Sequence, residues 1–137
     1  MESGAIRSAP RLARLDHLVL TVASIDKTVR FYTGVLGMTE VVFGNGRRAL
    51  SFGQQKLNLH QAGHEFEPKA ARPTPGSADI CLIVDADPDT IAAWLHGRGV
   101  SVAEGPVART GALGPITSFY FRDPDGNLVE LATYVMP

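Results

Sequence analysis

Apolar and polar residues alternate in several short segments of the chain, and two longer segments repeat apolar residues at helical spacing. Such alternation is typical of strands that bury one face. The predicted strands are 15–22, 38–43, 47–52, 56–61, 78–84, 100–103, 118–121 and 128–134. A helix is expected after the first strand of each half, with Ser24 and Asp87 as N-caps and with glycines near its end. The order strand, helix, three strands therefore occurs twice.

The two halves also match each other residue by residue. The first strands and the glycines that end the helices match at a shared offset of 62 residues (17 to 79 and 37 to 99). In the last strand of each half, Asn58 matches Glu130. We therefore predict an α+β fold in which two βαβββ modules in tandem form an incomplete barrel round a central cup.

Turn-forming residues mark the boundaries within this single domain. Residues 62–77 are polar and contain prolines and glycines, which favour a linker over a strand or helix. We expect the linker to join a first module at 15–61 to a second module at 78–135. The arginine-containing segment 1–14 is expected to form a flexible leader.

Several polar side chains fall on strand positions that point away from the helices. Because side chains alternate across a strand, His17, Asn58, His60, Asp79 and Glu130 all occupy the non-helix faces of their sheets. If the two sheets curl towards each other, these residues line one cup. Buried carboxylates without a partner are costly, and a divalent cation removes that cost. Mixed sets of imidazoles and carboxylates are common metal shells, so a metal site is predicted.

The predicted shell contains His17 and Glu130, which occupy non-equivalent positions of their modules. The third ligand stays open at this point. Asp79 is the counterpart of His17, whereas His60 is the better ligand type for a transition metal but lies one pleat beyond Asn58. Asn58 could also contribute its amide oxygen. Cys81 shares this face and is expected to be a small buried apolar residue.

The composition excludes several classes of protein. The net charge is −1, which does not suggest a nucleic-acid or membrane partner. No apolar run is long enough for a transmembrane helix, and the first residues lack the apolar stretch of a signal peptide. Cys81 is the single cysteine, so no internal disulfide can form. A cytoplasmic protein is expected.

Three motifs resemble the vicinal oxygen chelate superfamily, which includes glyoxalase I, bleomycin resistance proteins and extradiol dioxygenases. They are His17-x-x-Leu-x-Val, the helix Arg30-Phe-Tyr-x-x-Val-Leu-Gly-Met, and Phe121-x-Asp-Pro-Asp-Gly-Asn-x-x-Glu-Leu. The resemblance extends from Leu15 to Tyr134. The segments 56–60 and 73–79 are similar to a bacterial subgroup described as glyoxalase-like or virulence-associated.

The resemblance implies paired βαβββ modules round a divalent metal such as Zn, Ni, Mn or Fe, and a homodimer. It puts ligands on His17 and Glu130, and the family's other ligand positions fall on Asn58 and Asp79. Glyoxalase I usually has Glu or Gln where this chain has Asn58, and His or Glu where it has Asp79. The chain therefore departs from the usual ligand pattern at two positions.

The leading hypothesis is a metal-dependent lyase or isomerase that acts on a small substrate with adjacent oxygens. The metal would act as a Lewis acid, and Glu130 or Asp79 would move the proton. Two alternatives stay open: a binding protein without catalytic activity, such as a drug-sequestering protein, and a ring-cleaving dioxygenase.

Overall fold

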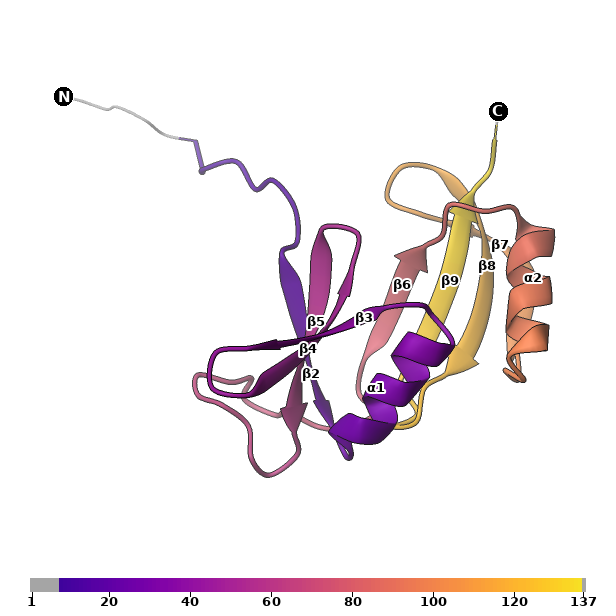
Figure 1. Ribbon diagram of the computed structural model, residues 1–137. Coiled ribbons are helices and arrows are strands. Elements are labelled where there is room, and N and C mark those ends of the chain that lie inside the picture. Colours follow the sequence, from indigo (N-terminus) through magenta and orange to yellow (C-terminus); the bar gives the residue numbers. More distant parts are fainter. Residues whose placement is uncertain (1–7, 137) are drawn as a thin grey trace.

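The chain folds into two modules that contain the same elements in the same order (Figure 1). The computed structural model describes residues 8–136, so the first half of the predicted leader lies outside the described residues. The elements of the first module are β2 (His17–Val22), α1 (Ile25–Gly34), β3 (Thr39–Phe43), β4 (Arg47–Phe52) and β5 (Gln55–Gln61). Those of the second are β6 (Asp79–Ile83), α2 (Pro88–Gly97), β7 (Glu104–Thr110), β8 (Pro115–Arg122) and β9 (Leu128–Tyr134).

Each module contains one four-stranded sheet. The strand orders are β2-β5-β4-β3 and β6-β9-β8-β7, so the two sheets have the same topology. The first strand of each module runs parallel to the last, and the other pairs are antiparallel. Val19 pairs with Asn58 in the first sheet, and Cys81 pairs with Glu130 in the second. The predicted α+β fold of two modules without a closed barrel is confirmed.

Both helices begin where the sequence predicts. The Ser24 side chain accepts a hydrogen bond from the amide of Lys27, and the Asp87 side chain accepts one from the amide of Thr90. Such caps satisfy amides that have no partner within the helix. The turn after α1 ends at Gly37, which has a φ of 68° that favours glycine.

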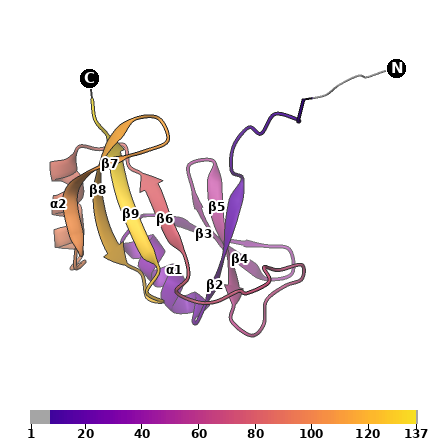
Figure 2. The same ribbon diagram turned by 180° about the vertical axis from the view of Figure 1, so that it is seen from behind.

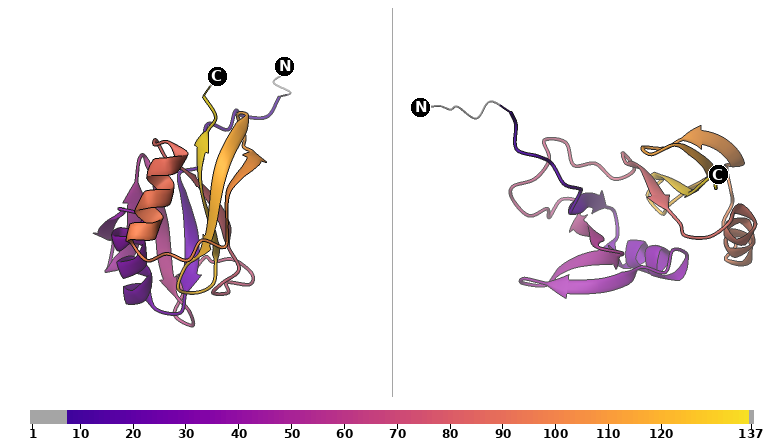
Figure 3. Two further views of the ribbon diagram at one scale, coloured as in Figure 1. Left: turned by 90° about the vertical axis from the view of Figure 1, so that its right-hand side faces the viewer. Right: turned by 90° about the horizontal axis from the view of Figure 1, so that it is seen from above.

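The helices pack on their own sheets and leave the other sheet faces open. α1 contacts β3, β4 and β5, whereas α2 contacts β8 and β9. Seen from behind and from above, α2 lies at the outer edge of the second module, whereas α1 lies near the middle of the molecule (Figures 2 and 3). Leu20 and Val22 are buried towards α1 as predicted, but Leu18 is 42% exposed. Leu18 lies near the start of edge strand β2, whose first half is exposed.

A shared apolar core and a few polar contacts hold the two modules together. The hydroxyl of Tyr32 on α1 donates to Asp123 Oδ2 at 2.8 Å, and both residues are buried. Trp94 Nε1 on α2 donates to the carbonyl of Val35 at 2.6 Å. The buried turn that contains Asp123 therefore fixes α1 against the second module.

The second half differs from the prediction at one strand. A strand was expected at 100–103, but β7 spans Glu104–Thr110 and β8 begins earlier than expected, at Pro115. Gly105 and Pro106 disfavour a central strand. They are accommodated because β7 is an edge strand whose register shifts between Glu104 and Val107.

Among residues 8–136, no helix has the length and apolar character needed to cross a membrane.

Candidate functional site

The open face of the first sheet consists of transverse rows of side chains. The strand register places His17 beside Lys56, Val19 beside Asn58, and Thr21 beside His60. The face predicted for His17, Asn58 and His60 is therefore the face on which they lie. On the second sheet, Cys81, Glu130 and Tyr120 form the corresponding row.

His17 is oriented by its neighbour. Its ring nitrogen Nδ1 lies 2.9 Å from Asp16 Oδ2 on the exposed end of β2. The bond from His17 lowers the pKa of the Asp16 carboxyl, which accepts at this contact. Because a carboxylate oxygen accepts, Nδ1 donates at this contact, and in the neutral form of the ring Nε2 is the nitrogen that can accept or bind a metal. Metal-binding histidines are commonly oriented by a carboxylate in this way.

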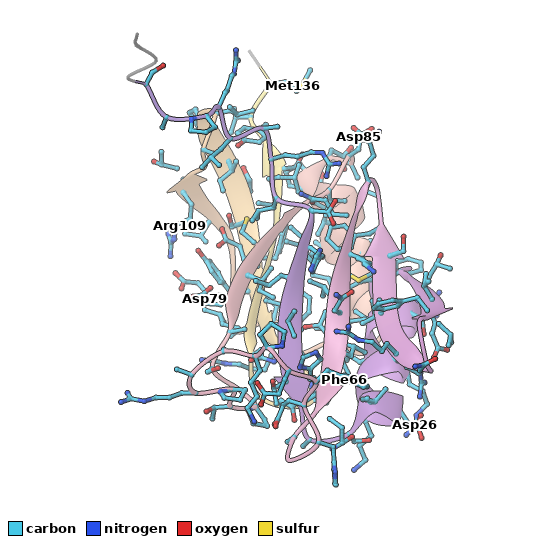
Figure 4. The ribbon with its side chains drawn as sticks, turned by 90° about the vertical axis from the view of Figure 1, so that its left-hand side faces the viewer. Asp26, Phe66, Asp79, Asp85, Arg109 and Met136 are labelled. Carbon is cyan, nitrogen blue, oxygen red and sulfur yellow. The ribbon has the colours of Figure 1, made fainter. Side chains whose placement is uncertain are left out.

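The two carboxylates of the second sheet differ in their surroundings. Ser118 Oγ donates to Glu130 Oε2 at 2.6 Å, and Ser118 is fully buried, so one oxygen of Glu130 is fixed. Asp79 is exposed at the start of β6. Within residues 8–136, neither Asp79 nor Glu130 forms an ion pair with a basic side chain. Figure 4 shows Asp79 and Arg109 along one side of the second module.

Cys81 is exposed, not buried as the sequence suggested. It lies on edge strand β6, where only one neighbouring strand, β9, covers it. Partial burial and the adjacent Glu130 carboxylate raise the pKa of its thiol to about 11. The thiol is therefore protonated at neutral pH and is not an activated nucleophile.

His60 is buried beside an arginine. Its Nε2 lies 3.3 Å from Arg47 Nη2, and its ring packs edge-on against Phe66 of the linker, which lies over the first sheet in Figure 4. Burial and the Arg47 charge lower the pKa of His60. Neutral Nε2 accepts from the guanidinium, and a metal ion at this nitrogen would compete with a cation already there.

Asn58 contains a buried atom that lacks a partner. The residue is 5% exposed, and its Oδ1 accepts no hydrogen bond from any residue that the structure describes. A buried polar atom without a partner costs about 1–3 kcal/mol. Because the oxygen is buried, a bound molecule would supply its missing donor only after a neighbouring side chain moves.

The predicted ligands do not form one cluster within a single chain. Among residues 8–136, no three His, Cys, Asp or Glu side chains lie close enough to hold one ion. His17 belongs to the first sheet, whereas Asp79 and Glu130 belong to the second. His17 and Cys81 line one small recess of about 90 Å³ where the edges of β2 and β6 face each other.

Two basic residues of the open face were not among the predicted site residues. Arg47 and Lys56 were assigned only to strands, where charged side chains are usually solvated. The signal that could have identified them is their position. Lys56 shares a strand face with Asn58 and His60, and Arg47 lies next to His60 across the sheet.

The family comparison agrees with the fold. A family model described as "Glyoxalase/Bleomycin resistance protein/Dioxygenase superfamily" matches residues 14–131. Virulence protein STM3117 of Salmonella typhimurium is 57% identical over 122 residues, which cover 89% of this chain and 85% of that protein. Its crystal structure matches with a TM-score of 0.90 and 55% identity, and the match covers 92% of this chain and 100% of that chain.

A fungal relative and two more distant structures complete the comparison. Glyoxalase domain-containing protein RDO1 of Mycosarcoma maydis is 57% identical over 120 residues, which cover 88% of this chain and 68% of that protein. A lactoylglutathione lyase from Agrobacterium tumefaciens (22% identity, TM-score 0.69, 90% of this chain and 95% of that chain) shares the fold. So does TnmS3, an antibiotic binding protein from Streptomyces (23% identity, TM-score 0.72, 93% and 100%). One fold thus serves an enzyme and a binding protein.

Proposed function

We propose that this chain, which belongs to the Glyoxalase/Bleomycin resistance protein/Dioxygenase superfamily, is a metal-dependent lyase or isomerase for a small substrate with adjacent oxygens. The observation that carries the proposal is that hydrogen bonds orient two of the predicted metal ligands. His17 Nδ1 is held by Asp16, and Glu130 Oε2 is held by Ser118. A second polar group therefore contacts each of the two side chains, as is usual for metal ligands.

The donor set fits a divalent ion. One imidazole and two carboxylates suit Zn²⁺ and similar transition metals. Asp79 is the better third ligand than His60, because Arg47 lies beside His60 Nε2. The three donors lie on the non-helix faces of two different sheets, and His17 and Asp79 are exposed in one chain. We propose that a second copy covers these faces, so that His17 of one chain meets Asp79 and Glu130 of the other in a homodimer.

Glu130 and Asp79 would have different roles in the proposed reaction. A divalent ion, when bound, supplies Lewis-acid stabilisation of negative charge on the substrate oxygens. Glu130 is fixed by Ser118 and would hold one position in the shell. Asp79 has no hydrogen bond to another described residue that would fix its carboxylate, so it is the candidate for accepting a substrate proton.

The amount of metal retained by purified variants distinguishes a metal ligand from a catalytic base. We expect His17→Ala and Glu130→Gln to reduce the metal retained by purified protein strongly, whereas His96→Gln on the exposed end of α2 should leave it unchanged. Asp79→Asn discriminates between two roles: lost metal identifies a ligand, and retained metal with lost turnover identifies a base. Metal content unaffected by His17→Ala, Glu130→Gln and Asp79→Asn would refute the proposed site.

A second candidate function is a binding protein without catalytic activity. The observation in its favour is a recess of about 460 Å³ between β2 and the linker, which is lined by His60 but by neither His17 nor Glu130. A volume of this order can enclose a small ligand. A metal-free protein that binds a small molecule in this recess without turnover would favour this reading.

A further inference from the structure

Arg47 and Lys56 converge on one aromatic ring of the first sheet. The Lys56 ammonium lies 3.7 Å from the centroid of the Phe43 ring, and the Arg47 guanidinium lies 5.2 Å from it. The same guanidinium lies 4.7 Å from the ring centroid of Phe66 in the linker. Three separate strands and the linker thus bring two cations together on the open face.

Neither cation has a carboxylate partner within residues 8–136. Other basic side chains of this part do form ion pairs: Arg48 with Glu40 and Asp26, Arg109 with Glu104, and Lys69 with Glu65 and Glu67. Two carboxylates near this surface already have other partners: Glu65 is bonded to the Gly63 amide and to Lys69, and Asp16, on which the Lys56 charge acts, contacts His17. Like charges held close together repel each other, and a bound anion would remove that cost.

His60 and Asn58 extend this surface with polar atoms. Because His60 Nε2 accepts from Arg47, the proton of the neutral ring is on Nδ1, which can donate to a ligand. Asn58 lies between Lys56 and His60 on the same face of β5, and its Oδ1 is the buried acceptor without a donor. A ligand hydroxyl that reaches this buried oxygen would supply that donor.

We propose that Arg47, Lys56 and His60 bind the anionic group of a small hydroxylated substrate, with Asn58 Oδ1 accepting from its hydroxyl. The anionic group is a carboxylate or a phosphate, since a guanidinium and an ammonium recognise both. The inference depends on the proposed function in one respect: both place the substrate on the non-helix face of the first sheet. Lys56 neighbours His17 across β2 and β5, but none of the four residues belongs to the proposed metal shell, so binding can be measured without metal.

The test measures anion binding to metal-stripped full-length protein by calorimetry. The probes are acetate, glycolate and inorganic phosphate, at low and at high salt. We expect Arg47→Gln and Lys56→Gln each to weaken binding of the preferred anion roughly tenfold. The matched controls Arg30→Gln and Lys27→Gln remove the same charge from the exposed surface of α1 and should leave binding unchanged. Arg47→Lys should bind with intermediate affinity, because it keeps the charge but loses the planar fork.

The comparison of probes identifies the anion. Tighter binding of acetate than of phosphate assigns a carboxylate, and the reverse assigns a phosphate. Glycolate should bind more tightly than acetate, and Asn58→Leu should abolish that difference.

Three results would overturn the inference. The first is equal binding by Arg47→Gln and wild-type protein. The second is equal binding of glycolate and acetate. The third is loss of the dimer in Arg47→Gln, since the cations would then serve the acidic face of a second copy. Arg47-dependent binding in a protein that purifies without metal would support this inference while the proposed enzyme fails.

Discussion

The buried hydrogen bond between Tyr32 and Asp123 offers a direct test of how the modules are held together. Tyr32→Phe removes the hydroxyl that donates to Asp123 Oδ2 at 2.8 Å and leaves the ring in the core. Asp123 keeps three other donors, from the amides of Asp125 and Asn127 and from the Asn127 side chain. The Asp123 carboxylate therefore loses one of its four hydrogen bonds and keeps the other three.

The magnitude follows from the type of bond that is lost. A buried hydrogen bond to a charged group contributes about 1.5–3 kcal/mol. Because three donors remain, we expect the free energy of unfolding to fall by about 1.5–2 kcal/mol, in the lower part of that range. For a chain of this length, this corresponds to a fall in Tm of about 5–8 °C. Urea denaturation followed by circular dichroism measures the free energy directly.

Tyr134→Phe is the matched control. The Tyr134 hydroxyl accepts from the amide of Leu113 in an exposed loop at 3.1 Å. Loss of this neutral bond should cost about 0.5–1 kcal/mol. A Tyr32→Phe protein as stable as Tyr134→Phe would refute the reasoning that the Asp123 turn fixes α1 against the second module.

Three further predictions concern other parts of the molecule. Cys81 should react slowly with iodoacetamide at pH 8, because a pKa of about 11 leaves roughly one thiol in a thousand ionised. Glu130→Gln should lower that pKa and speed the reaction, and an unchanged rate would contradict the cause assigned to the shift. Asp87→Ala should destabilise the protein by about 1 kcal/mol in urea denaturation, because the Thr90 amide loses its cap. Sedimentation should show a homodimer at micromolar concentration; a monomer would remove the second copy from the proposed site.

The sequence predicts local structure well because alternation and caps are local properties. β4 and β9 begin and end where the pattern predicts, and both N-caps are correct. The prediction misplaced β7 because Gly105 and Pro106 are unfavourable in a central strand. An edge strand such as β7 tolerates them. Leu18 shows a related difference. The alternating pattern of its strand predicts a buried residue, but its position in an edge strand leaves it half exposed.

The candidate site could be predicted only to the level of single sheet faces. The side on which His17 and Glu130 lie follows from alternation within each strand. The distance between them depends on how two separate sheets are placed, and no local pattern determines that placement. The unpaired state of Arg47 and the buried oxygen of Asn58 also depend on neighbours that only the folded chain brings together.

The central claim is that His17 and Glu130 hold a divalent metal, and metal analysis of the purified protein tests it most directly. The account predicts about one tightly bound transition-metal ion per chain. Most of that metal should be lost in His17→Ala and in Glu130→Gln, with the fold intact by circular dichroism. Wild-type metal content in both variants, or a well-folded wild-type protein that takes up no divalent ion, would contradict it.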